Sequence, residues 1–142
     1  DGRGQVGPQV TPGDMEMAIT ADPLFEQALV VGEARAYLSA LVVLDGEQWK
    51  KLAHESGLDP EVPENLGDPK LAKLLIERIR TRLKAFPGYA KIRRVGALLE
   101  PWTPANGLVT PTFKVRRAAV LERHRAVVEA MYSDGPAPEG ID

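Results

Sequence analysis

The spacing of apolar residues along the chain changes between the period of a strand and the period of a helix. Residues 25–31 and 37–44 are short apolar runs. The five residues between them, GEARA, have the character of a connecting loop, so the two runs are expected to form a β-hairpin with a longer loop. Residues 92–99 are expected to form a third strand.

Four other segments have the apolar spacing of helices. The strongest begins at Asp68-Pro69, where a capping residue precedes proline at the first helical position, and it is closed by Pro87-Gly88. Asp45 is expected to cap a second helix, with Gln48 in the third helical position. The apolar face of the strongest helix consists of Leu71, Leu75, Ile79, Leu83 and Phe86. The other predicted helices cover residues 14–20, 45–56 and 115–132.

These elements predict an α+β fold with a small three-stranded sheet, which includes a β-hairpin and is packed by about four helices. A length of 142 residues suits one domain with a core of its own. Residues 1–14 are rich in glycine and are expected to be a flexible, hinge-like lead-in to a domain over residues 15–132. Residues 133–142 are rich in Gly, Pro and acidic residues, as is typical of a disordered tail.

The composition excludes several kinds of site. The chain has no cysteine, which removes disulfides, thiolate metal sites and cysteine nucleophiles, and two histidines cannot supply a three-histidine metal site. No metal site is therefore predicted, and His124 is expected to be a packed residue rather than a base. No apolar stretch is long enough for a transmembrane segment and no signal peptide is visible, so a cytoplasmic protein is expected.

The net charge of −2 conceals a strong asymmetry between the two halves of the chain. Residues 1–70 contain 5 basic and 13 acidic side chains, whereas residues 71–142 contain 13 basic and 7 acidic ones. A basic stretch between Lys73 and Arg125 suits a polyanionic partner, but on charge alone the favoured interpretation is that these residues solvate two helices. Nucleic acid is the weakest of the candidate partners, because aromatic residues make up 6% of the chain and offer no platform for stacking bases.

The connection between the third strand and the last helix is the most informative segment. Residues 100–113, EPWTPANGLVTPTF, contain three prolines and an Asn-Gly turn, and connections of this length are usually functional or disordered. Its apolar residues are expected to anchor it to the core; they are Trp102, Leu108, Val109 and Phe113. Lys114, Arg116 and Arg117 follow at the expected helix N-terminus, where they either bind an anion or are simply solvated.

Two stretches resemble the long-chain acyl-CoA synthetases, which are fatty acid–CoA ligases of the adenylate-forming superfamily. Residues 101–117, PWTPANGLVTPTFKVRR, are similar to the end of these enzymes, where an NGLLTPTxK stretch precedes a cationic helix. Residues 15–45 resemble the family's helix and hairpin, in which an ADPLIEQAVVVG pattern leads to RPYLSALIV. The resemblance covers Met15 to about Tyr132.

The resemblance implies the mobile C-terminal domain of an ATP-dependent long-chain fatty acid–CoA ligase. Family members carry a larger N-terminal adenylation domain with the ATP phosphate loop, the Mg²⁺ ligands and the fatty acid pocket, and no such phosphate loop occurs in this sequence. Lys114 matches the family's catalytic lysine, while Arg116 and Arg94 are candidates for binding cofactor phosphates, including those of coenzyme A. Without the N-terminal adenylation domain, the 142-residue chain is expected to be inactive as an enzyme.

In residues 1–14 the sequence departs from the family pattern. Where the family has a glycine-rich hinge of the AGGKNVAP type, this chain has GRGQVGP at residues 2–8, so no hinge residue is assigned.

Two alternatives to this interpretation of function and location stay open. One is a stand-alone, non-catalytic module of the same fold that binds an anionic ligand or regulates a partner, and the other is peripheral association of a cytoplasmic enzyme with a membrane.

Overall fold

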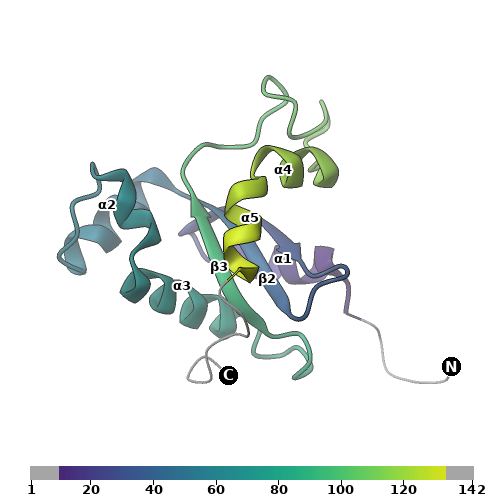
Figure 1. The fold of residues 1–142 in the computed structure, drawn as a ribbon, viewed down its shortest axis with the longest axis horizontal. Coiled ribbons are helices and arrows are strands. Elements are labelled where there is room, and N and C mark those ends of the chain that lie inside the picture. Colours follow the sequence, from purple (N-terminus) through teal and green to yellow (C-terminus); the bar gives the residue numbers. More distant parts are fainter. Residues whose placement is uncertain (1–9, 134–142) are drawn as a thin grey trace, which may run out of the picture.

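The computed structural model describes residues 10–133, so the predicted tail beyond residue 133 and most of the predicted lead-in lie outside the described residues. A three-stranded sheet in the order β1-β2-β3 forms its centre (Figure 1). β1 (Phe25–Val31) pairs with β2 (Leu38–Leu44) in antiparallel fashion, and β2 pairs with β3 (Ile92–Leu98) in parallel. The predicted hairpin and the α+β class are confirmed.

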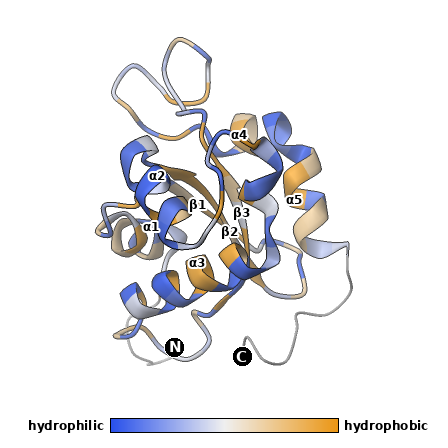
Figure 2. Cartoon of the chain, turned by 90° about the vertical axis from the view of Figure 1, so that its left-hand side faces the viewer, coloured by the Kyte–Doolittle hydropathy of each residue, from blue (hydrophilic) through white to orange (hydrophobic). Residues whose placement is uncertain are grey.

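Helices cover both faces of the sheet. One face packs against α1 (Pro12–Thr20), α2 (Gly46–Glu55) and α3 (Pro69–Arg82), through a core that includes Ile19, Trp49 and Leu75. The other face packs against α4 (Arg117–Arg123), α5 (Arg125–Tyr132) and the segment that precedes them. Figure 2 shows the hydrophobic strands between helices that combine hydrophilic and hydrophobic residues. β2 lies in the middle, and six of its seven residues are buried.

The helix starts follow from local capping chemistry. The Asp45 carboxylate accepts a hydrogen bond from the Gln48 backbone N–H at 3.0 Å, as the sequence predicts. Asp68 does the same for Lys70 and Leu71 at the start of α3. α1 begins at Pro12, two residues before its predicted start, because the Thr11 hydroxyl provides the cap by accepting from the Asp14 N–H.

The third helix and the last helix also differ from the prediction in their extent. α3 ends at Arg82 rather than at Phe86, because the chain tightens into a turn in which the Phe86 N–H donates to the Leu83 carbonyl at 2.9 Å. A short 3₁₀ helix, η1 (Pro63–Gly67), lies in the connection between α2 and α3. The predicted last helix over residues 115–132 starts at Arg117 and is broken at His124, whose φ of −108° and ψ of 29° depart from helical values.

The packing of α5 against the sheet depends on one glycine. A Cβ atom on Gly96 of β3 would lie 2.6 Å from Val127 Cγ1 and 3.2 Å from Leu41 Cδ2. α5 therefore approaches β3 more closely than any side chain at position 96 would allow. Over residues 10–133, no helix has the length and apolar character needed to cross a membrane.

Candidate functional site

The loop over residues 99–116 projects beyond the end of β3 and returns to α4 (Figure 1). It is held at its start by Trp102, which is 2% exposed. The Trp102 N–H donates to Gln27 Oε1 at 2.8 Å, and Gln27 Nε2 donates to the Trp102 carbonyl at 2.9 Å. The Trp102 indole N–H donates to His124 Nε2 at 3.2 Å. Trp102 therefore ties the loop both to β1 and to the break between α4 and α5.

Asn106 organises the next part of the loop. Its Oδ1 accepts from the backbone N–H groups of Thr103 and Leu108, and its Nδ2 donates to the Pro101 carbonyl at 2.9 Å. Gly107 follows with a φ of +79°, in the left-handed region that glycine tolerates best. The Asn-Gly turn that the sequence predicts is thus a closed, internally hydrogen-bonded unit.

A tight hairpin then presents Lys114. Val109 and Val115 form an antiparallel bridge, and within it the Thr110 N–H donates to the Lys114 carbonyl at 2.8 Å. The Lys114 N–H donates in turn to the Thr110 hydroxyl at 3.0 Å. Phe113 lies at the tip with a φ of +67° and 74% of its surface exposed. The expectation that Phe113 anchors the loop is therefore wrong, whereas Trp102, Leu108 and Val109 are buried as expected.

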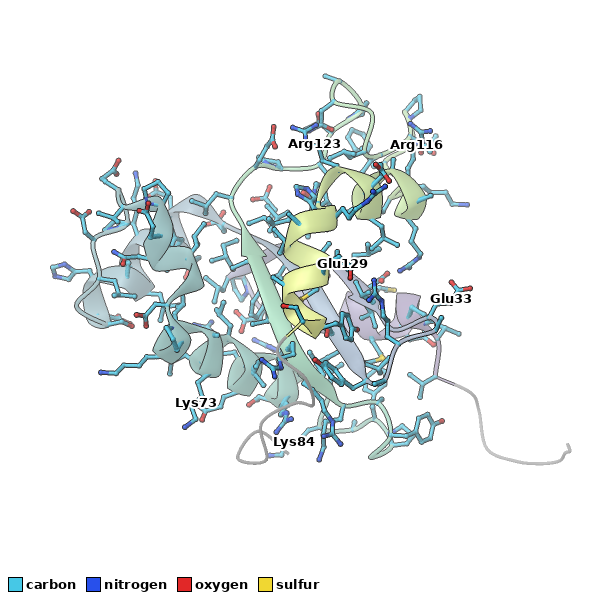
Figure 3. The ribbon with its side chains drawn as sticks, in the orientation of Figure 1. Glu33, Lys73, Lys84, Arg116, Arg123 and Glu129 are labelled. Carbon is cyan, nitrogen blue, oxygen red and sulfur yellow. The ribbon has the colours of Figure 1, made fainter. Side chains whose placement is uncertain are left out.

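The three cations at the end of this loop have different surroundings. Arg116 donates from Nη1 to the Gly107 carbonyl at 2.8 Å, and Arg117 donates to the Val30 carbonyl at 3.0 Å. The Lys114 ammonium is exposed and has no hydrogen bond or ion pair within residues 10–133. Arg116 is the N-cap of α4 and Arg117 its first residue, while Lys114 lies two residues before the cap. Figure 3 shows Arg116 beside this projecting loop, at the opposite end of the molecule from Lys84.

Arg117 fixes the end of the loop to two other elements. Its guanidinium pairs with the Glu16 carboxylate of α1 at 3.0 Å. Glu16 also accepts a hydrogen bond from the Val30 N–H at 2.7 Å. Both backbone polar groups of Val30, on the outer edge of β1, are therefore bonded to side chains, and α4 is tied to α1 and to β1.

His124 is packed between charged and apolar neighbours, as predicted. Burial lowers the pKa of the His124 imidazole below its ordinary value, and the nearby Arg123 guanidinium lowers it further, while Glu100 opposes the shift. A neutral imidazole is also what the indole hydrogen bond requires, because Nε2 must accept. His124 therefore acts as a neutral anchor for Trp102.

The structure does not bring Arg94 together with Lys114 and Arg116. Arg94 lies near the start of β3, next to Ser39 of β2 in the strand register, whereas the loop with Lys114 follows the other end of β3. Arg94 lines a groove of about 780 Å³ between α3, β3 and α5. The residues that the structure describes contain no group of three or more His, Asp or Glu side chains placed to hold a metal ion.

Sequence reasoning missed two residues that shape this site, Gln27 and Glu16. Gln27 is a polar residue within an apolar strand, at the position where the β1–β2 register is irregular, and this polarity was the available signal. Glu16 lies on a short helix with no sequence pattern that links it to a segment 101 residues away. Its role depends on the tertiary structure alone.

Residues 5–135 match the family described as the AMP-binding enzyme C-terminal domain. The chain is 30% identical over 129 residues to the long-chain-fatty-acid–CoA ligase FadD15 of Mycobacterium tuberculosis, covering 89% of this chain and 22% of that protein. It is 27% identical over 135 residues to long chain acyl-CoA synthetase 2 of Arabidopsis thaliana, covering 90% of this chain and 20% of that protein. The chain thus spans about a fifth of the length of these relatives.

Two solved structures are similar to this fold. The A domain of carboxylic acid reductase from Segniliparus rugosus, in complex with AMP and a co-purified carboxylic acid, matches with a TM-score of 0.71 and 24% identity. That match covers 90% of this chain and 19% of the reductase chain, and at this identity it concerns the fold alone. The A-PCP didomain of the same reductase matches with a TM-score of 0.69 and 25% identity, over 88% of this chain and 16% of that one.

Proposed function

The chain belongs to the family of AMP-binding enzyme C-terminal domains, and on that basis we propose that it is the mobile C-terminal domain of an ATP-dependent long-chain fatty acid–CoA ligase. Its partner is a larger N-terminal domain of the same polypeptide, which holds ATP and the fatty acid. Relatives with 30% and 27% identity that are named as long-chain fatty acid–CoA ligases support the substrate class.

Lys114 carries this proposal. Its ammonium is the charged group of the loop that has no partner among the described residues, while Arg116 and Arg117 are bonded to backbone carbonyls. The loop that presents it is fixed at Trp102 and Asn106, so the lysine has a defined position together with a long side chain. A compact cation on a preorganised loop is suited to stabilising charge that develops on a substrate.

The proposed step is the formation of an acyl-adenylate. A carboxylate oxygen of the fatty acid attacks the α-phosphorus of ATP, and the bond from that phosphorus to the pyrophosphate leaving group breaks. Both reacting groups are anionic, and negative charge moves from the attacking carboxylate onto the α-phosphate oxygens and the leaving pyrophosphate. The Lys114 ammonium lies against both groups and lowers the energy of this transition state without transferring a proton.

The second step forms the thioester with coenzyme A. After the domain has rotated to present a different face, the thiol sulfur attacks the acyl carbon and forms the carbon–sulfur bond. The bond from that carbon to the phosphate oxygen of AMP breaks, so AMP leaves, and the thiol proton passes to water. In the proposed arrangement Arg94, which lies on β3 and away from the lysine loop, meets the coenzyme A phosphates. Arg116 acts in the first step, beside Lys114. The Mg²⁺ ion belongs to the large domain in this proposal.

The test uses the full-length polypeptide that contains these residues. We expect ATP–pyrophosphate exchange that depends on a long-chain fatty acid, followed by release of AMP when coenzyme A is added. The 142-residue chain alone should show neither reaction. Exchange that depends on another class of carboxylic acid would refute the substrate, and an inactive full-length polypeptide would favour a non-catalytic module.

A further inference from the structure

Phe113 combines two features that are unfavourable for the domain by itself. It exposes 74% of its surface, and its φ of +67° lies in the left-handed region that residues with a Cβ atom seldom adopt. Asparagine or glycine is the usual residue in this third position of a hairpin loop. An apolar, bulky residue here therefore gains nothing from the packing of the described domain.

The surrounding hydrogen bonds hold Phe113 in this conformation. Its N–H donates to the Thr110 carbonyl at 2.8 Å, and the Thr110 hydroxyl lies 3.1 Å from that of Thr112. The base of the hairpin is closed by the Arg116 N–H, which donates to the Leu108 carbonyl at 2.9 Å. The phenyl ring is thus presented outward from a fixed backbone, one residue before Lys114.

We infer that Phe113 is a docking residue, whose ring enters an apolar recess on the large domain beside the substrate carboxylate and thereby sets the position of the Lys114 ammonium. This inference rests on the proposed function. Strained backbone conformations that the surrounding structure holds in place cluster at active sites and ligand-binding segments. A buried aromatic anchor is also the kind of residue that dominates the affinity of an interface.

The proximity of Lys114 favours the large domain over a lipid surface as the partner. Phe113 and Lys114 are consecutive in the chain, so a surface that covers the Phe113 ring also lies close to the Lys114 ammonium, which must reach the substrate. Insertion of the ring into a bilayer would hold the ammonium among lipid headgroups, away from the carboxylate and the α-phosphate. Contact with the large domain can bury the Phe113 ring and at the same time bring the Lys114 ammonium to the substrate.

The decisive experiment compares Phe113→Asn with Phe113→Leu in the full-length polypeptide. Asparagine tolerates the left-handed conformation but removes the ring, so we expect an unchanged or higher unfolding temperature together with a roughly 10- to 30-fold slower acyl-adenylate formation. Leucine keeps an apolar group and should retain activity to within about 3-fold. Tyr89→Asn is the matched control, because Tyr89 is 69% exposed on the loop at the other end of β3. Full activity of Phe113→Asn would overturn the inference.

A second measurement does not depend on catalysis. A photoreactive benzoylphenylalanine at position 113 should crosslink to the large domain when ATP and the fatty acid are present. Crosslinks confined to residues 10–133, to a second copy, or to added phosphatidylglycerol vesicles would each overturn the docking role. If the polypeptide activates a different class of carboxylic acid, the proposed substrate fails, while a crosslink to the large domain still supports the role of Phe113.

Discussion

Gln27 and Trp102 are 75 residues apart in the chain and are joined by two reciprocal hydrogen bonds between the Gln27 side chain and the Trp102 backbone. The amide of Gln27 reproduces the donor and acceptor pair of a neighbouring strand. β1 thereby fixes the first residues of the loop that carries Lys114. The position of Lys114 thus depends on a residue that is remote from it in sequence.

Replacing Gln27 by Ala should lower the free energy of unfolding by about 1–2 kcal/mol, because two hydrogen bonds of a half-buried pair are lost together. The Trp102 amide should also exchange its hydrogen faster. Chemical denaturation and hydrogen exchange of the 142-residue chain measure both effects. Glu26→Ala, at the exposed neighbouring position on β1, is the control, and an equal loss in that variant would show that the effect is not specific to the pair.

Lys114→Ala should slow acyl-adenylate formation by about 10²–10³, as expected when one preorganised charge is removed from a reaction centre. Thioester formation from a supplied acyl-adenylate should change much less, because that step uses a different face of the domain. The two half-reactions are measured separately in the full-length polypeptide. Lys84→Ala, at an exposed lysine on the opposite end of the molecule, should leave both rates unchanged (Figure 3). Equal losses in both half-reactions would refute the role of Lys114.

Asp22→Asn should destabilise the fold by about 2–3 kcal/mol at neutral pH, because the 3% exposed carboxylate accepts two hydrogen bonds from Arg78, at 2.9 and 2.7 Å. Burial alone would raise the pKa of Asp22, but the bonds from Arg78 and Leu24 outweigh it and hold the pKa below its ordinary value of 3.8. The contribution to stability is therefore present above pH 3.8 and is lost as the pH falls below it. Thermal unfolding between pH 7 and pH 3 checks this, and a variant as stable as wild type at pH 7 would contradict it.

His124→Gln should reduce the pH dependence of stability near neutrality. The pKa of His124 is lowered in the folded state, mainly by burial, so the unfolded chain binds a proton first as the pH falls through about 6.5. The wild type should therefore lose stability between pH 7.5 and pH 5.5, and the variant should lose less. Glutamine keeps an acceptor for the Trp102 indole and does not titrate. His54→Gln, at an exposed position on α2, is the control that should behave like wild type.

Gly96→Ala should destabilise the domain by about 1–3 kcal/mol, because the new methyl group would overlap Val127 at 2.6 Å and force α5 away from β3. Gly88→Ala is the matched control, since a Cβ at position 88 meets nothing within 4 Å. Denaturant unfolding of both variants gives the comparison. A Gly96→Ala variant as stable as the Gly88→Ala variant would mean that α5 does not need this close approach.

The parts of the fold that the sequence predicted correctly are those set by residues close together in the chain. β1 matches its predicted range, because its seven residues are closely bounded by turn residues. The caps at Asp45 and Asp68 were predictable because capping depends on side chains within three residues. The break at His124 was not predictable, because both sides of it have helical spacing and the interruption coincides with a tertiary bond to Trp102.

The candidate site was predicted in part. Family resemblance singled out Lys114, whose catalytic role stays a prediction, and the prolines with Asn106-Gly107 indicated an ordered loop. The exposure of Phe113 could not be inferred, since an aromatic residue in an apolar loop is normally an anchor, and its direction depends on the left-handed backbone at that position. The engagement of Arg116 and Arg117 with carbonyl groups likewise required the three-dimensional structure.

The two side chains bonded to Val30 have a consequence for the behaviour of the protein at high concentration. β1 is an outer strand of the sheet, and free N–H and C=O groups on an outer strand are a template for pairing with another chain. Glu16 occupies the Val30 N–H and Arg117 occupies its carbonyl, so both groups are withdrawn from such pairing. The contacts that fix the lysine loop also protect this strand against aggregation, and substitutions that loosen the loop here would promote assembly of the protein into intermolecular sheets.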